Sequence, residues 1–361
     1  MRGRVALVGL IVTSLFVAGT GTGFAATKSN FGNGRVKSSS TTTTTNLGST
    51  TSTTNATTTT SSTVSIQTST TTSSTIPVST TTAPLPTTTT TALVDGYSEK
   101  IYGVTIDDIS NLQGLVGSLK ALPKKPTVRI VFDENVPAKE YATAVNQIHP
   151  YSYIVGEILD SAYVKTLTVD QYLARTKEYL DAFGGTVDIW EIGNEVNGEW
   201  LGATADVVAK ISGAYDMAKA RGFKTALTLY YNPNCWARSS NEMFSWTGLN
   251  IPDRMKQSTD YVLISYYEED CNNYRPSNWV GIFDKLHTMF PSSKLGFGEI
   301  GMADPAISST LAKAQSLMTY YYGVNVSTPG FIGGGFWWYF AEDCVPTTKD
   351  LFTTLSTTWM S

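Results

Sequence analysis

The chain has 361 residues, with 26 Lys and Arg against 30 Asp and Glu, so its formal net charge at pH 7 is -4. The first 93 residues carry five basic residues and no acidic one, which leaves 21 basic against 30 acidic residues in the remainder. An acidic domain repels phosphate backbones, so we expect no nucleic-acid partner. Only two histidines occur, and no Gly-x-Ser-x-Gly motif, which argues against a multi-histidine metal centre and a Ser–His–acid hydrolase.

Residues 1–25 have the pattern of a secretory signal peptide. Arg2 and Arg4 give a positively charged start, an apolar run covers 5–18, and small residues near Ala25 suit cleavage. Because the apolar run is short for a membrane span, we expect cleavage and no stable membrane insertion, with an uncleaved anchor as the alternative. The sequence therefore predicts a secreted, extracellular protein that could associate with a cell wall or surface.

Residues 26–93 consist mainly of Thr and Ser. Such a segment has too little apolar surface to offset the entropy lost on ordering, so we expect a disordered linker whose hydroxyls suit O-glycosylation. Residues 94–361 follow as one domain, about as long as a single (β/α)8 barrel.

Within residues 94–361, short runs rich in β-branched and aromatic residues alternate with segments of helical periodicity. The strand-like runs lie at 101–106, 127–132, 152–157, 187–194, 224–230, 260–266, 294–299 and 332–339. Helices are expected at 169–183, after a capping box begun by Thr168, and at 205–221, before Gly222. The pattern predicts an α/β fold with a single parallel (β/α)8 TIM barrel. An open doubly wound sheet is the alternative, but no Gly-x-Gly-x-x-Gly follows the first strand.

Two of the strand-like runs end in a glutamate near glycine. The first reads Asp188-Ile-Trp-Glu-Ile-Gly-Asn-Glu195 and the second Lys294-Leu-Gly-Phe-Gly-Glu299. Barrels of this kind carry their chemistry at the carboxyl ends of the strands, so both glutamates should lie at one mouth, on strands four and seven. Two carboxyl groups placed there are the minimum equipment for cleaving a glycosidic bond. For either glutamate alone, a solvated loop carboxylate is the alternative.

With Asn194-Glu195 ending the fourth strand and Glu299 ending the seventh, residues 100–345 resemble the clan A glycoside hydrolases, a retaining (β/α)8 group. The resemblance implies that Glu195 is the acid/base, that Glu299 is the nucleophile and that Asn194 binds the sugar 2-hydroxyl. Val196 follows the pair where many members have proline, so the family within the clan is not resolved. The implied activity is a retaining O-glycosyl hydrolase that needs no cofactor and acts on a β-linked poly- or oligosaccharide, with endo action expected.

The resemblance also implies a role for Arg129 on the second strand, as an arginine that approaches the nucleophile and keeps it ionised. The alternative is a structural ion pair with Glu191. It further implies a tyrosine at the end of strand six that donates a hydrogen bond to the nucleophile, for which alternation favours Tyr266 over Tyr267.

The resemblance also implies that a tryptophan at the end of the eighth strand forms the floor under the sugar ring. The pair Trp337-Trp338 supplies two candidates, and we favour Trp338, with the other ring packed in the core. Acidic pairs near other strand ends, among them Glu157 with Asp160, are expected to form a solvated rim.

Three cysteines, Cys235, Cys271 and Cys344, lack zinc-type spacing, so we expect no metal site. In an exported protein a disulfide is the default. Cys235 and Cys271 follow adjacent strands and should pair, and a bond between Cys271 and Cys344 is the main rival.

Two other functions fit the same sequence. The barrel could bind carbohydrate without cleaving it, although the two carboxylates argue against this. The chain could also be a surface or cell-wall protein in which the glycosylated stalk is the functional part. For the glycosidase we expect a monomer whose partner is a poly- or oligosaccharide substrate.

Overall fold

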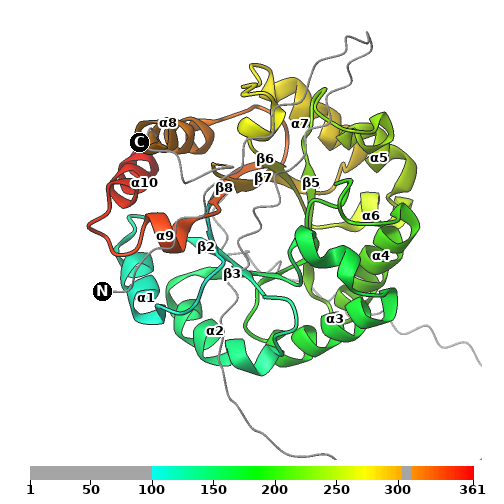
Figure 1. Ribbon diagram of the computed structural model, residues 1–361, viewed down its shortest axis with the longest axis horizontal. Coiled ribbons are helices and arrows are strands. Elements are labelled where there is room, and N and C mark those ends of the chain that lie inside the picture. Colours follow the sequence, from blue (N-terminus) through cyan, green and yellow to red (C-terminus); the bar gives the residue numbers. More distant parts are fainter. Residues whose placement is uncertain (1–99, 303–309) are drawn as a thin grey trace, which may run out of the picture. The chain divides into compact units, whose positions relative to one another are not determined.

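The computed structural model describes residues 100–302 and 310–361. The predicted signal peptide (1–25) and linker (26–93) lie outside these residues. The described residues contain eight strands, each paired in parallel with its two neighbours, in a closed ring that follows the order of the chain (Figure 1). The single (β/α)8 TIM barrel predicted from the sequence is confirmed.

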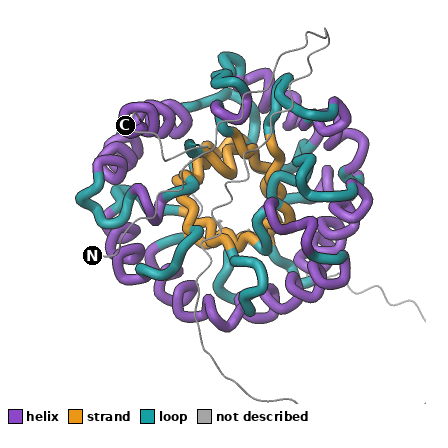
Figure 2. The backbone as a smooth tube through the Cα atoms, viewed as in Figure 1, coloured by secondary structure: helices purple, strands orange, loops and turns teal. Residues whose placement is uncertain are grey.

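The strands form the inner ring and the helices lie outside it (Figure 2). The strands are β1 (Ile101–Ile106), β2 (Thr127–Val131), β3 (Tyr153–Glu157), β4 (Ile189–Gly193), β5 (Lys224–Tyr230), β6 (Tyr261–Tyr266), β7 (Lys294–Ile300) and β8 (Phe331–Trp337). The helices are α1 (Leu112–Ala121), α2 (Ala142–Ile148), α3 (Val169–Phe183), α4 (Thr204–Ala220), α5 (Met243–Asn250), α6 (Asp253–Ser258), α7 (Trp279–Met289), α8 (Thr310–Gly323), α9 (Phe340–Asp343) and α10 (Asp350–Met360).

Side chains alternate between the inside and the outside of the ring, as the pleat of a strand requires. Inward residues such as Val155, Ile189 and Leu263 form a small apolar cluster inside the barrel. Outward residues such as Val104 and Ile130 belong to the larger core between strands and helices. Each fully buried aliphatic side chain contributes about 1.5–3 kcal/mol to folding. The apolar cluster fills the barrel interior and leaves the carboxyl ends of the strands for polar groups.

Helix α3 begins where the sequence predicts. The Thr168 side chain accepts a hydrogen bond from the Gln171 N–H, and the Gln171 side chain accepts one from the Thr168 N–H, which completes the capping box. The Tyr172 hydroxyl of this helix donates to the Ile192 carbonyl, so the helix is tied directly to β4. Helix α4 ends one residue earlier than predicted, and Gly222 follows it with a φ of 75°.

Strands β4 and β7 both carry a shift in register near their carboxyl ends. In β7, Phe297 pairs with Ile264 and Glu299 pairs with Ser265, so Gly298 is an extra residue. Without that residue, alternation would turn Glu299 toward the helices; with it, Glu299 takes the inward direction of Ser265. Bulges commonly re-aim a side chain in this way next to a functional site.

Strand β8 depends on three consecutive glycines. Gly333, Gly334 and Gly335 have φ values of 75°, 99° and 100°, a region that residues with a Cβ rarely adopt. A Cβ on Gly334 would lie 2.1 Å from the Phe297 carbonyl oxygen of β7, and one on Gly335 would lie 2.1 Å from the Tyr322 ring. Conformation favours glycine at all three positions, and packing also requires it at Gly334 and Gly335.

The loops after β5 and β6 are joined by a disulfide between Cys235 and Cys271, while Cys344 is free and buried. Among the helices of the described residues, none combines the length and apolarity needed to cross a bilayer.

Replacement of Gly334 by alanine should destabilise the barrel by several kcal/mol. Left-handed strain costs about 1–3 kcal/mol, and the overlap with the Phe297 carbonyl adds about 1–3 kcal/mol of overpacking. Denaturant unfolding measures the loss. Gly117→Ala is the matched control, because Gly117 lies exposed in α1 and a Cβ there would meet no neighbouring atom, so this variant should gain about 0.5–1 kcal/mol. Equal stabilities of the two variants would contradict the requirement for glycine in β8.

Candidate active site

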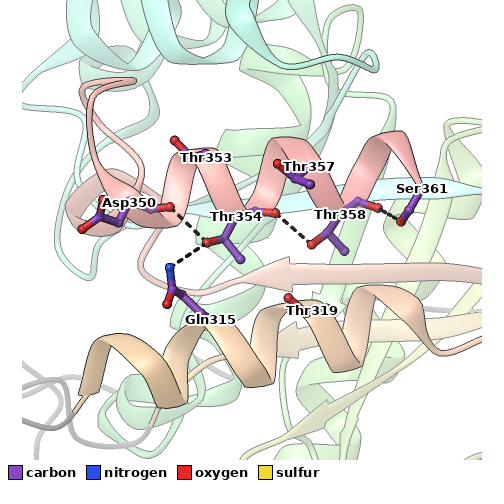
Figure 3. A pocket seen from close by; sticks show the side chains of 8 residues that line it. All are labelled: Gln315, Thr319, Asp350, Thr353, Thr354, Thr357, Thr358 and Ser361. Atoms are coloured by element: carbon purple, nitrogen blue, oxygen red, sulfur yellow. Dashed lines mark hydrogen bonds between the residues drawn. The ribbon is translucent and has the colours of Figure 1, made fainter.

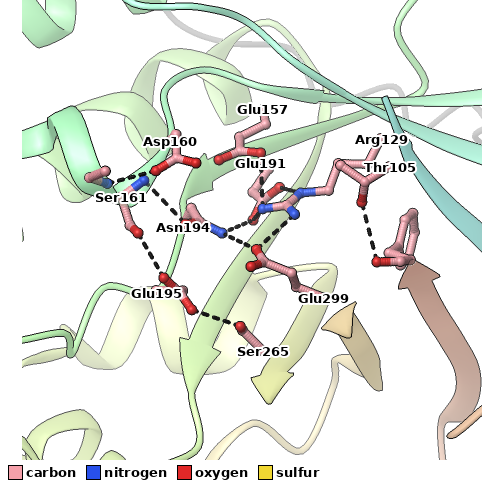
Figure 4. Close-up of polar contacts among 12 residues, drawn as sticks. Thr105, Arg129, Glu157, Asp160, Ser161, Glu191, Asn194, Glu195, Ser265 and Glu299 are labelled. Atoms are coloured by element: carbon pink, nitrogen blue, oxygen red, sulfur yellow. Dashed lines mark hydrogen bonds and ion pairs between the residues drawn. The ribbon is translucent and has the colours of Figure 1, made fainter. Parts of the chain in front are cut away.

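A single buried arginine contacts three carboxyl groups inside the barrel mouth (Figure 4). Arg129 of β2 donates from Nε and Nη2 to the two oxygens of Glu191, at 2.6 and 3.2 Å. Its Nη1 donates to Glu299 Oε2 at 2.9 Å, and its Nη2 lies 2.9 Å from Glu157 Oε2. The sequence left open whether Arg129 approaches Glu299 or pairs with Glu191, and it does both.

The charges in this cluster do not balance, because three carboxyl groups surround one guanidinium. Burial alone would lower the pKa of Arg129, but Glu157, Glu191 and Glu299 outweigh it, so the pKa lies well above its usual value. Burial raises the pKa of Glu157 well above the usual range, although Arg129 acts in the opposite direction. Neither oxygen of Glu157 makes a hydrogen bond of good geometry to the described residues, despite the ion-pair distance. Glu157 therefore holds a proton more readily than an ordinary glutamate does.

Glu299 accepts hydrogen bonds on both carboxylate oxygens. Its Oε2 receives Arg129 Nη1 and, at 3.2 Å, the side-chain amide of Asn194, while its Oε1 receives the Tyr267 hydroxyl at 2.8 Å. Burial, followed by the nearby charge of Glu299, raises the pKa of Tyr267 well above its usual value, so the phenol stays protonated and able to donate. Donors on both oxygens favour the ionised form of a carboxylate.

The expectation that Tyr266 contacts Glu299 is wrong, because the inward face of β6 continues to Tyr267 and not to Tyr266. Tyr261, Leu263 and Ser265 point into the barrel, and Tyr267 continues that set. Tyr266 lies on the outward face, where its hydroxyl donates to the Tyr274 carbonyl and its ring packs among aromatic residues of the outer core.

Glu195 is held by two serine hydroxyls (Figure 4). Ser265 of β6 donates to its Oε1 and Ser161, which follows β3, donates to its Oε2, both at 2.7 Å. Glu195 is buried and has a φ of 47°, a left-handed conformation that costs a residue with a Cβ about 1–2 kcal/mol. Such strain at a buried carboxylate is typical of functional sites.

Trp338 lies against the cluster, with the Arg129 guanidinium 5.4 Å from its ring centre and part of the side chain exposed. Trp337, the second tryptophan expected near the sugar, is instead fully buried in the outer core. Its indole N–H donates to Asp343. Only Trp338 of the pair is therefore available to a ligand in the mouth.

Acidic residues follow several strands on the side of the expected rim, among them Asp107 after β1 and Glu342 in α9. Burial and the charge of Glu342 raise the pKa of Asp107, which follows β1, to about 7. Glu157 does not belong to this rim, because it is 1% exposed and paired with Arg129. Over residues 100–302 and 310–361, no group of three His, Cys, Asp or Glu side chains is arranged to hold a metal ion.

Sequence reasoning missed Glu157, Tyr267, Ser161 and Ser265 as members of the site. Parity along β3 offered a signal for Glu157, because it shares the inward face of Val155. The same parity identifies Ser265 and Tyr267 only once strand pairing has fixed the inward face of β6. Ser161 follows β3 in a short 3-10 turn and carries no pattern that distinguishes it from other loop serines.

A second polar depression lies on the outside of the barrel, between α8 and α10 (Figure 3). Threonines dominate its lining, and Gln315 of α8 donates across it to Thr354 of α10. Asp350 is the one titratable side chain among its described lining residues, so the depression has no pair of groups for acid/base chemistry.

No protein-family model matches the chain, and no curated protein matches it. Among solved structures, a GH18 chitinase from Pseudoalteromonas aurantia is 11% identical, with 71% of this chain and 98% of the chitinase covered and a TM-score of 0.46. A β-glucosidase from Exiguobacterium marinum is 11% identical over 68% of this chain and 84% of its own, with a TM-score of 0.44. A sugar phosphate isomerase/epimerase from Parabacteroides distasonis is 13% identical over 74% and 95%, with a TM-score of 0.38. Similarities this low assign no activity to the chain.

Replacement of Arg129 by methionine should cost about 3–5 kcal/mol of stability near pH 7.5, because it leaves buried carboxylates without their cation. The loss should be smaller near pH 4.5, where the carboxyl groups can bind protons and become neutral. Denaturant unfolding at the two pH values tests this. Arg254→Met, which removes an exposed pair with Asp216, should change stability little at either pH. An Arg129→Met loss that is the same at both pH values would contradict the charge argument.

Proposed function

We propose that the protein is a retaining glycosidase that hydrolyses β-linked poly- or oligosaccharides by double displacement. The observation that carries the proposal is the unequal environment of two carboxyl groups at the ends of β4 and β7. Glu299 accepts from an arginine, an amide and a phenol that favour its ionised form, whereas Glu195 accepts from two neutral serine hydroxyls. An ionised nucleophile beside a carboxyl group that can carry a proton is what this reaction requires.

In the first step, Glu195 gives its proton to the glycosidic oxygen as the bond from that oxygen to the anomeric carbon breaks. A carboxylate oxygen of Glu299 forms a bond to the same carbon from the opposite face, which gives a covalent glycosyl-enzyme. In the second step, Glu195 takes a proton from water, the water oxygen bonds to the anomeric carbon, and the ester bond to Glu299 breaks. The sugar leaves with its original anomeric configuration.

Arg129 and Tyr267 would hold the Glu299 carboxylate in position for attack through their bonds to its two oxygens. The Asn194 amide, which lies 3.2 Å from Glu299 Oε2, would bind the sugar 2-hydroxyl next to the reacting carbon. The partly exposed ring of Trp338 would stack on the face of the sugar. Of these contacts, the hydrogen bond to the sugar 2-hydroxyl strengthens in the transition state.

The remaining features suit an enzyme that works outside the cell on a polymer. A signal peptide would export the chain, and the Thr/Ser-rich segment would space the barrel from a surface or from other parts of a wall. We further propose endo action on a chain that lies across the open mouth, with the protein acting as a monomer.

The first test is hydrolysis by the full chain across a panel of β-linked polysaccharides and aryl glycosides. Glu299→Ala and Glu195→Ala should each lower kcat by several orders of magnitude, because each removes a group that the reaction cannot replace. Added azide should restore turnover in Glu299→Ala and give a glycosyl azide of inverted configuration. Glu140→Ala, at an exposed position, is the matched control. Activity that neither substitution changes would contradict the mechanism. Tight sugar binding without cleavage would favour a carbohydrate-binding barrel.

The second test compares the two neighbouring tyrosines of β6. Tyr267→Phe should lower kcat about 10- to 100-fold, because it removes a hydrogen bond to a charged carboxylate. Tyr266→Phe removes a hydroxyl that donates to the Tyr274 carbonyl, away from Glu299, and should leave kcat within about twofold, since peripheral changes have small effects. Steady-state kinetics on an aryl glycoside decide between them. A larger effect from Tyr266→Phe would support the assignment that alternation predicts from the sequence.

A further inference from the structure

The two serines that contact Glu195 differ in what else they bind. Ser161 Oγ accepts a hydrogen bond from the indole Nε1 of Trp200 at 3.1 Å while it donates to Glu195 Oε2 at 2.7 Å. An indole nitrogen can only donate, so the row Trp200–Ser161–Glu195 has one direction. The single hydroxyl hydrogen of Ser161 is directed at Oε2.

Ser265 is under no such restriction. Of the residues that the structure describes, Glu195 Oε1 is the one hydrogen-bond partner of its hydroxyl, and none donates to it. A serine hydroxyl rotates freely and can donate or accept. Ser265 can therefore donate to Oε1 when Glu195 is ionised and accept from Oε1 when Glu195 is protonated.

We propose that the transferable proton of Glu195 resides on Oε1, facing Ser265, and that Ser161 and Trp200 are positioning residues that keep Oε2 as a hydrogen-bond acceptor. This inference rests on the proposed role of Glu195 as acid/base. The proton leaves Oε1 for the glycosidic oxygen in the first step, and a proton from water returns to Oε1 in the second. The Ser265 hydroxyl turns to donate to Oε1 when the proton leaves and turns back to accept from Oε1 when the proton returns. The Ser161 hydroxyl donates to Oε2 throughout.

The backbone supports a separate role for the Ser161 side chain. The Ser161 N–H donates to the Asn194 side-chain carbonyl at 3.2 Å, and the Asn194 amide in turn contacts Glu299. Replacement of Ser161 by alanine keeps this backbone bond and removes only the hydroxyl. Its effect on Glu195 can thus be separated from any effect on Asn194.

Other titratable groups face Glu195 from the neighbouring strands. Tyr230 lies at the end of β5 and Tyr267 follows β6, and burial raises the pKa of both far above the usual value, so both stay neutral through the working pH range. Glu299 of β7 is linked to the adjacent Asn194. A change in the pH response caused by Ser161 or Ser265 therefore reports on Glu195 rather than on a titrating tyrosine.

The test measures kcat/KM of the full chain between pH 4 and 9 for wild type, Ser161→Ala, Ser265→Ala and Trp200→Phe. The basic limb is the part of the profile in which kcat/KM falls as the pH rises. Ser161→Ala should move this limb to higher pH by about one unit, because the ionised Glu195 carboxylate loses a hydrogen-bond donor that its protonated form does not need. Trp200→Phe should move it less, in the same direction. Ser265→Ala should lower kcat with a smaller shift, since Ser265 serves both protonation states. Ser161→Thr keeps the hydroxyl and should restore the wild-type limb.

A second readout does not depend on turnover. The indole 1H–15N signal of Trp200, identified by its loss in Trp200→Phe, should titrate in the free protein with the midpoint of the basic limb. The titration should vanish in Ser161→Ala and in Glu195→Gln. Titration without hydrolysis of any substrate would support the directed row of hydrogen bonds and count against the glycosidase proposal. An indole signal that does not respond to pH, or a limb moved as far by Ser265→Ala as by Ser161→Ala, would overturn the inference.

Discussion

The charge of Arg129 allows several carboxyl groups to lie together inside an otherwise apolar barrel. Burying an isolated carboxylate costs free energy of folding. The Arg129 guanidinium binds Glu191 through two nitrogens and binds Glu157 and Glu299 through one nitrogen each. The four residues come from β2, β3, β4 and β7, and Arg129 and Glu299 are separated by 170 residues of chain. The cluster is complete only when the ring has closed, so the site and the fold depend on the same event.

Local irregularities in the strands then orient Glu195 and Glu299. The extra residue in β7 turns Glu299 inward, and a register shift in β4 precedes the left-handed turn at Glu195. Both strands carry a glycine at the irregularity, Gly193 and Gly298. A regular barrel would present only every second residue to its interior, whereas these two strands depart from strict alternation just before Glu195 and at Glu299.

The sequence predicts the parts of this arrangement that follow from a local, repeating pattern of residues. It does not predict the parts that depend on contacts between distant segments. The eight strands and the start of α3 are predictable because apolar alternation and a capping box act locally. The positions of Glu195 and Glu299 at strand ends are predictable for the same reason. The choice between Tyr266 and Tyr267 is not, because it needs the inward face of β6, which only pairing with neighbouring strands fixes. Ser161 lies in a turn, where side chains follow no repeating inward and outward pattern, so its place in the site is not predictable.

The glycines of β8 also govern how the protein can vary through evolution. Every missense change of a glycine codon introduces a side chain, and at Gly334 and Gly335 that side chain meets a carbonyl of β7 or the ring of Tyr322. Tolerance at Gly335 would first require a smaller residue at Tyr322, whose hydroxyl also binds the backbone of β1 and β8. Neutral substitution is therefore disfavoured at these two positions of β8, and a change at Gly335 depends on a prior change at Tyr322.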